Sequence, residues 1–292
     1  MKKSKLNALI ELLDDPDILV FGMVEKELLK ETHEIIPELE KKWESSFDEN
    51  CQERIENIIQ NLQFKKTRDK LQNWLSTSPE DQNLIDGFCI VDHFQYPDLN
   101  PLNLQLKVET LRKSIWLELN NSLTLLEKTT ILNHFLFNMN GYSVNLSNAH
   151  SPQNCFLNQV LDTKKGNSIS MSIFYTILAR QLELPAQLID FPKNPLVAMV
   201  DSDLAQKVHG SSHHSDVLFY INPSNKGSIT SRKEIEYHLK RNEYLPFNEY
   251  TEPKPDSLFI KRLLESLQES YLSVGFTEKE ERIKELLRLF NE

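Results

Sequence analysis

The sequence predicts an α+β fold that is mostly helical and carries a small antiparallel sheet. Apolar residues recur at helical spacing through residues 1–145, and short runs of branched and aromatic residues begin only at Ala186. Between them, residues 154–192 predict a short helix, a tight Lys-Lys-Gly turn, a buried helix and a strand. We therefore expect the sheet to pack on that buried helix.

The composition of the chain favours a globular protein with its own core over membrane, disulfide-rich and nucleic-acid-binding classes. The chain has 292 residues, of which 39% are hydrophobic, enough to build a substantial core. Its net charge of −10 argues against nucleic acid and anionic membrane as partners. Acidic residues interrupt the apolar start of the chain, so we expect no secretory signal, and no apolar run approaches the ~20 residues of a membrane span. Three widely spaced cysteines indicate neither a disulfide framework nor a zinc pair. We expect a cytoplasmic protein without a cofactor.

The first expected domain is a helical region over residues 1–145. Leu6, Ile10 and Leu13 form one apolar stripe, and the segment 14–17 breaks it and supplies a helix N-cap. This first part resembles a HEAT-type helical repeat. Further helices are expected at 52–77, 82–95, 102–120 and 123–139, with Trp74 and Trp116 in the core.

The second expected domain covers residues 146–245. After a long loop that ends at Asn154, strands are expected at 186–191, 196–200 and 217–221, with a polar loop between the last two. Ser231 is expected to cap a helix that runs to Leu239, with Glu234 in the capping-box position. Residues 246–292 predict a helical pair, 256–273 and 277–291, of the size of one tetratricopeptide-like unit.

Two segments of the chain resemble one family. The run NCFLNQVLDTKKGNSISMSIFYTILARQLELPA is similar to a family pattern of a helix, a basic-Gly-Asn turn and a buried helix, and FYINPSNKGSITSRKEI is similar to its closing strand, turn and helix. This is the SirB-type transglutaminase-like family, in the form with a helical N-terminal region and a tetratricopeptide-like tail. The resemblance implies a papain-like, transglutaminase-like core around the buried helix.

The resemblance also implies where catalytic residues would stand. In catalytic members of the wider superfamily, a cysteine at the helix start attacks an acyl group, a histidine on the next strand activates it, and an Asp or Asn orients the histidine. In this chain those positions fall on or beside Ser168, on Asn194 and on Asn222. The nucleophile and the base are both replaced, and either Asn167 or Ser168 is expected to be a helix cap.

We therefore expect a non-catalytic protein that binds a protein or peptide partner, whose identity the sequence does not give. The candidate binding residues are Asn154, Asn158, Ser168, Asn194 and Asn222. The first two are also readily explained as architectural, and Gly166 is expected to supply a backbone angle that other residues resist. The alternative is a cysteine-dependent hydrolase or acyltransferase that uses Cys155, the one cysteine near the core motif.

A weaker alternative is a metal site. His209, His213 and His214 lie close together in the sequence, and two of them are four residues apart, a spacing that suits zinc on a helix. Gly210 and two serines interrupt that spacing, so a solvated loop is the favoured interpretation.

Overall fold

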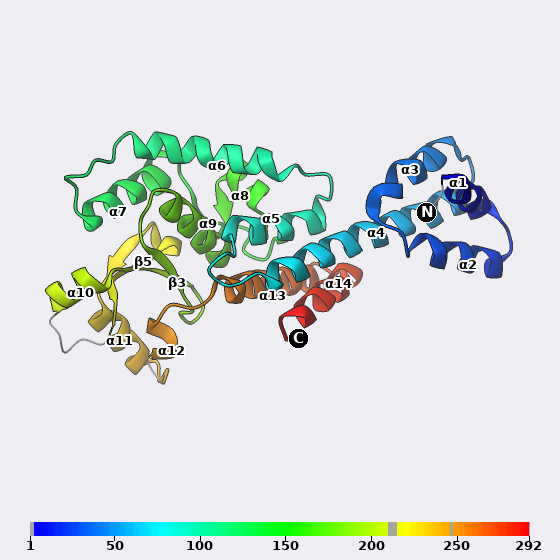
Figure 1. The fold of residues 1–292 in the computed structure, drawn as a ribbon. Coiled ribbons are helices and arrows are strands. Elements are labelled where there is room, and N and C mark those ends of the chain that lie inside the picture. Colours follow the sequence, from blue (N-terminus) through cyan, green and yellow to red (C-terminus); the bar gives the residue numbers. More distant parts are fainter. Residues whose placement is uncertain (1–2, 210–214, 246–247, 292) are drawn as a thin grey trace. The chain divides into compact units, whose positions relative to one another are not determined.

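The computed structural model describes residues 3–209, 215–245 and 248–291 of the chain (Figure 1). It divides into two compact units, Met1–Asn73 and Trp74–Glu292. The predicted fold class is confirmed, since the chain is mostly helical with one small antiparallel sheet, which lies in the second unit. The limits expected at residues 145 and 245 stay predictions. Among the described residues, no helix combines the length and the apolarity that crossing a membrane requires.

The described residues of the first unit, 3–73, form helices and the turns between them. The α-helices are α1 (Lys3–Glu11), α2 (Ile18–Leu28), α3 (Ile36–Ser45) and most of α4 (Glu49–Ser76). The carboxylate of Asp17 accepts the backbone N–H of Leu19 at 2.8 Å, so the expected N-cap is confirmed. The apolar stripes of the four helices meet in one core that includes Leu6, Ile10, Leu13, Val24, Leu28, Leu39, Ile55, Ile58 and Leu62.

The second unit contains one buried helix, α9 (Ser168–Gln181), and further helices, several of which pack on it. The further helices are α5 (Leu84–Gln95), α6 (Pro101–Trp116), α7 (Leu125–Asn133), α8 (Leu157–Thr163), α10 (Ser202–His209), α11 (Arg232–Arg241), α12 (Asn248–Thr251), α13 (Asp256–Ser273) and α14 (Thr277–Arg288). Every residue of α9 from Ile169 to Ala179 is buried, and the helix contacts α5, α13, β3 (Ala186–Ile189) and β4 (Leu196–Val200). The helix is buried as expected, and the hydroxyls of its buried Ser170, Ser172 and Thr176 donate to backbone carbonyls.

The sheet has the order β3-β4-β5-β6, with all neighbours antiparallel. β5 is Val217–Asn222 and β6 is Ser228–Thr230, so the three expected strands are confirmed to within two residues. A fourth strand was not expected, because three residues are too few to show alternation. A parallel pair of two-residue strands, β1 (Ser143–Val144) and β2 (Lys165–Gly166), lies within the expected loop and turn. Helix α10 occupies part of the segment expected to be a loop.

The strand register assigns side chains to the two faces of the sheet. Ala198 pairs with Tyr220, and Val197 pairs with Ile221, so these two pairs point to opposite faces. The face that carries Ala198 and Tyr220 forms a core cluster with Ile235 of α11. Helix α11 therefore covers one face of the sheet.

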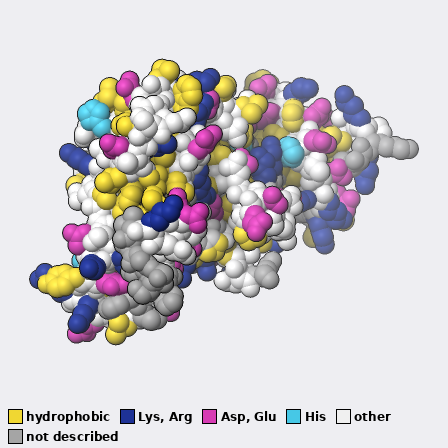
Figure 2. All heavy atoms as spheres, turned by 60° about the vertical axis from the view of Figure 1, so that its left-hand side comes forward, with side chains coloured by type: hydrophobic (Ala, Val, Ile, Leu, Met, Phe, Trp, Pro, Cys, Tyr) yellow, Lys and Arg dark blue, Asp and Glu magenta, His cyan; other side chains and the backbone are white. Residues whose placement is uncertain are grey.

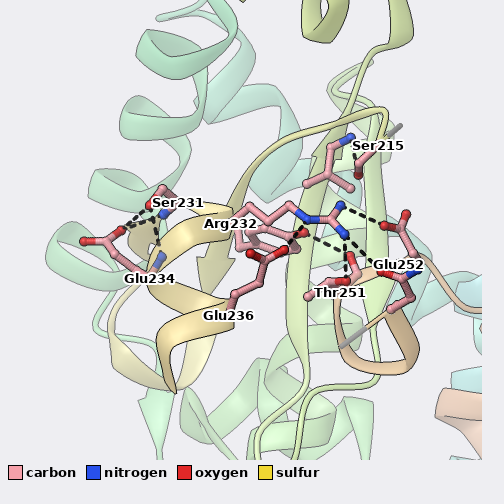
Figure 3. A network of polar contacts seen from close by, with 10 residues as sticks. Ser215, Ser231, Arg232, Glu234, Glu236, Thr251 and Glu252 are labelled. Carbon is pink, nitrogen blue, oxygen red and sulfur yellow. Dashed lines mark hydrogen bonds and ion pairs between the residues drawn. The ribbon is translucent and has the colours of Figure 1, made fainter. Parts of the chain in front are cut away.

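A polar network holds α11 to the rest of the unit (Figure 3). The Arg232 guanidinium donates to Glu236 Oε1 and to Glu252 Oε1, each at 2.8 Å, and to the carboxamide of Asn248 at 3.2 Å. The Tyr220 hydroxyl donates to the carbonyl of Thr251 at 3.0 Å. The charged Arg232 fork thereby joins the start of α11 to α12, and the neutral Tyr220 bond joins the sheet to α12.

The two tryptophans expected in the core differ. Trp74 is buried and its indole N–H donates to the carbonyl of Asn83 at 3.0 Å. Trp116 is 57% exposed, so its expected burial is wrong. It is the last residue of α6, where the chain leaves the helix. The helical pair at the C-terminus is confirmed, and Gly275 (φ +82°) makes the turn between α13 and α14.

Candidate functional site

The start of α9 is closed by Asn167. Its side-chain oxygen accepts the backbone N–H of Ser170 at 2.7 Å, and the Ser170 hydroxyl accepts the backbone N–H of Asn167 at 2.9 Å. This reciprocal pair is a capping box. Of the two expected caps, Asn167 is the one observed. Ser168 is the first helical residue, and its hydroxyl makes a long 3.5 Å contact with the carbonyl oxygen of Lys193.

Cys155 is sealed beneath this helix start. Its side chain is completely buried, and Asn167 Nδ2 donates to its Sγ at 3.2 Å. Burial raises the pKa of the Cys155 thiol to about 12, against smaller opposing effects of hydrogen bonds with Ser266, Asn167 and Ser270. Among the described residues, those three are the polar partners of the thiol, and none is a histidine. This environment opposes the thiolate that nucleophilic catalysis requires.

A cavity lies between α11 and the end of the sheet, and it has a volume of about 470 Å³. Asn194 and Asn222, which stand at the expected base and orienting positions, both line it. Ser168 is not among the lining residues. The full lining is Phe191, Pro192, Lys193, Asn194, Leu196, Asn222, Ser228, Thr230, Glu234, Ile235, His238, Asn242 and Tyr244.

The sheet register explains why Asn222 reaches this cavity. Asn222 pairs with Ser228, and Tyr220 pairs with Thr230, so these four side chains point to the face that α11 covers. The Asn222 carboxamide oxygen also accepts the backbone N–H of Ser224 at 3.0 Å, which closes the turn after β5. One polar side chain therefore both ends a strand and borders the cavity.

Asn194 reaches the cavity from the turn between β3 and β4. Lys193 has a left-handed backbone (φ +67°), and the backbone N–H of Asn194 donates to the carbonyl of Pro192 at 2.8 Å. This conformation turns the chain between the two strands, as the same conformation does for Lys164 and Lys226 where short helices end. Among the described residues, no partner hydrogen-bonds the exposed Asn194 carboxamide, so its donor and acceptor face solvent at the cavity rim.

Sequence reasoning missed His238. Its ring lies against Phe191, with centroids 5.6 Å apart, and lines the same cavity. The signal was present, because Glu234, His238 and Asn242 are spaced by four residues and therefore share one face of α11. The Glu234 carboxylate forms part of the helix cap, because it accepts the backbone N–H of Ser231 at 2.7 Å. That hydrogen bond lowers the pKa of Glu234.

Asn154 and Asn158 do not line the cavity. Asn154 is buried and binds the preceding loop, with its Nδ2 donating to the carbonyl of Asn148 at 2.8 Å. The Asn158 carboxamide oxygen accepts the backbone N–H of Gln159 at 2.7 Å. The side chains of both asparagines are therefore occupied in hydrogen bonds to nearby backbone groups.

Gly166 is needed for a reason other than the expected one. Its φ lies outside the left-handed region, whereas a Cβ at this position would lie 2.4 Å from Ser170 Oγ and 3.1 Å from Val160 Cγ2. The expected requirement for an unusual backbone angle is therefore wrong. Gly166 instead provides the space in which the Ser170 half of the capping box sits.

Asp92 of α5 is the most strongly buried acid near the motif. Its carboxylate accepts the backbone N–H groups of Leu157 at 2.6 Å and Asn158 at 2.9 Å, at the start of α8. Burial raises the pKa of Asp92 to about 7, although these two hydrogen bonds act in the opposite direction. Asp92 thus supplies a cap for α8 from a helix about 65 residues earlier in the chain.

The three candidate metal-binding histidines are not described by the structure as side chains. His213 and His214, and the side chain of His209, lie outside the described residues. Within the described part of the chain, His, Cys, Asp and Glu side chains form no group of three that could hold a metal ion.

On the face drawn in Figure 2, basic and acidic side chains are interspersed around hydrophobic ones.

Comparison with known proteins shows that the sequence matches one family model. The family model for the transglutaminase-like superfamily matches residues 103–265, more than half of the chain. A UPF0162 protein of Xylella fastidiosa (strain 9a5c) is 24% identical over 213 residues, which cover 70% of this chain and 71% of that protein. Human F-box only protein 21 is 23% identical over 253 residues, or 79% of this chain and 38% of that protein. No solved structure matches significantly.

Proposed function

The chain belongs to the transglutaminase-like superfamily, and we propose that it uses this fold to hold a peptide segment of a partner protein without acyl chemistry. Within the superfamily, we assign it to the SirB-type branch on the two matched segments described above. The observation that carries the proposal is the cavity itself, which is lined by Asn194 and Asn222, the two residues that the resemblance assigns to the positions of a base and its orienting residue.

The lining of the cavity suits a peptide. Carboxamides offer both a donor and an acceptor, which is the combination that a peptide group needs, and Asn194 and Asn242 both border the cavity. Phe191, Ile235 and Tyr244 supply apolar surface beside them. A pocket that combines apolar walls with a few directed polar groups is the usual form of a binding site. A volume of about 470 Å³ accommodates one or two side chains of a bound segment.

The positions that the resemblance assigns to the nucleophile and the base of acyl transfer hold Ser168 and Asn194. The side chain at the base position is an amide, which does not accept a proton near neutral pH. His238 enters from α11, and the one thiol near the motif is buried beneath α9 with a raised pKa. The alternative, a hydrolase or acyltransferase that uses Cys155, requires this thiol to react as a thiolate.

Selection of peptides from a displayed random library on the immobilised full chain tests the proposal. Ser228→Trp fills the cavity from its edge strand, because Ser228 is exposed and lines the cavity. Ile229→Trp is the matched control, because Ile229 is the next residue on the same strand, is 37% exposed and does not line the cavity. We expect selected peptides to bind the wild type and the control, and to bind Ser228→Trp at least about tenfold more weakly. Equal binding to both variants, or a library that yields no binder, would contradict the proposal.

Alkylation with iodoacetamide at neutral pH, read by peptide mapping, tests the alternative. A thiol whose pKa is raised by burial reacts more slowly than free glutathione. Labelling of native Cys155 as fast as glutathione would favour the enzyme, and labelling that appears only on unfolding would eliminate it.

A further inference from the structure

A second hollow lies in the first unit, between α3 and α4. It is lined by Glu40, Trp43, Glu44, Glu56, Ile59 and Gln60 and has a volume of about 420 Å³. We call it the acidic groove. It belongs to a different unit from the cavity that Asn194 and Asn222 line, and what it binds is independent of the function proposed above.

The charges of the groove are of one sign. Glu40 and Glu44 are one turn apart on α3, so their carboxylates share a face of the helix, and Glu56 faces them from α4. Like charges at this spacing destabilise a helix. Within the described part of the chain, neither Glu40 nor Glu44 takes part in an ion pair. A cation in the groove would relieve this repulsion.

An aromatic ring stands among these carboxylates. The indole N–H of Trp43 donates to Glu56 Oε1 at 2.9 Å, which orients the ring against α4. The residue is 36% exposed, so part of its ring is open to solvent at the groove. An oriented indole with an accessible face is the best side chain for binding a cation over its ring, and carboxylates beside it add hydrogen-bond acceptors.

We propose that the acidic groove binds an arginine side chain presented by a peptide segment of a partner protein. Arginine fits both features at once, because its planar guanidinium stacks on an aromatic face and forks to carboxylates. Lysine offers a point charge and makes less use of the ring. Ile59 provides apolar wall for the methylene groups of the side chain.

Fluorescence anisotropy with the full chain tests this proposal. The probe is a labelled Gly-Ser-Arg repeat peptide, compared with the same peptide carrying lysine or citrulline, the uncharged isostere of arginine. We expect the arginine peptide to bind most tightly, the lysine peptide more weakly and the citrulline peptide not measurably. Glu40→Gln/Glu44→Gln should weaken arginine binding roughly three- to tenfold, as expected for the loss of two exposed ion pairs.

The matched control is Glu49→Gln/Glu53→Gln. These two acids also lie four residues apart on an exposed face in the same unit, but outside the groove, so the variant has the same net charge. We expect the control to bind as the wild type does. Trp43→Leu keeps an apolar residue and should weaken arginine binding more than lysine binding. If the two double variants lost the same affinity for the arginine peptide, the effect would be one of net charge and the proposal would be wrong. Citrulline-peptide binding as tight as arginine-peptide binding would also contradict it.

Discussion

Asn167 donates its side-chain Nδ2 to the sulfur of Cys155 over 3.2 Å, while its Oδ1 accepts the backbone N–H of Ser170. The residue that caps the core helix therefore also binds the one thiol near the motif. The same Nδ2 donates to Ser266 Oγ at 3.0 Å. The start of α9, the segment before α8 and helix α13 thus meet in one partly buried polar contact, which serves the architecture of the core.

Asn167→Ala should destabilise the second unit. The change removes the cap and leaves the thiol and the Ser266 hydroxyl without their shared donor, so we expect a loss of about 1–2 kcal/mol in the free energy of unfolding. Ser168→Ala is the matched control at the next position, because its single 3.5 Å contact is too long to contribute much. Chemical denaturation followed by circular dichroism measures both. A larger loss for Ser168→Ala than for Asn167→Ala would show that the cap is misassigned.

Asp92 should make stability depend on pH in an unusual direction. Folding raises its pKa from 3.8 to about 7, so between these values the folded chain binds more protons than the unfolded chain. The stabilising contribution of this group is therefore fully present below pH 3.8 and is lost as the pH rises toward about 7.

The comparison of the wild type with Asp92→Asn isolates this contribution from other carboxyl groups. The wild type minus variant difference in unfolding free energy should fall as the pH rises from about 4 to 7, by an amount on the order of a few kcal/mol. Denaturant titrations at several pH values measure it. A difference that stays flat, or that grows with pH, would mean that the two amide hydrogen bonds outweigh burial and that the pKa is not raised.

Gly166→Ala should be destabilising because of one neighbouring atom. The new Cβ would stand 2.4 Å from Ser170 Oγ, so the capping box must open, at a cost of about 1–3 kcal/mol. Gly166→Ala/Ser170→Ala removes that atom and should recover part of the loss relative to Ser170→Ala alone. Thermal unfolding of the three variants gives the coupling. Strictly additive effects would point to backbone conformation, the explanation first expected from the sequence.

Features that depend on local pattern were predictable. Asp17, Asn167 and Ser231 are helix caps that act on residues two or three positions later, so residue type and spacing alone identify them. The three longer strands are branched or aromatic runs bounded by turns. Strand β6 escaped prediction because three residues show no period, and helix α10 because its polar composition is also typical of loops.

Features that depend on distant contacts were not predictable. The surroundings of Cys155 include Ser266 of α13, 111 residues later in the chain. The role of Asp92 depends on amides 65 and 66 positions later. The sequence did place Asn194 and Asn222 together through the family resemblance, but Ser168 does not line their cavity, and His238 comes from the covering helix.

The central claim is that this transglutaminase-like fold binds without acyl chemistry, and one measurement tests it most directly. Purified full chain is incubated with benzyloxycarbonyl-Gln-Gly and hydroxylamine, and hydroxamate formation is followed beside Cys155→Ala and Ser168→Ala. The account predicts that all three proteins give the rate of the protein-free blank. Formation above the blank in the wild type, abolished in either variant, would contradict it.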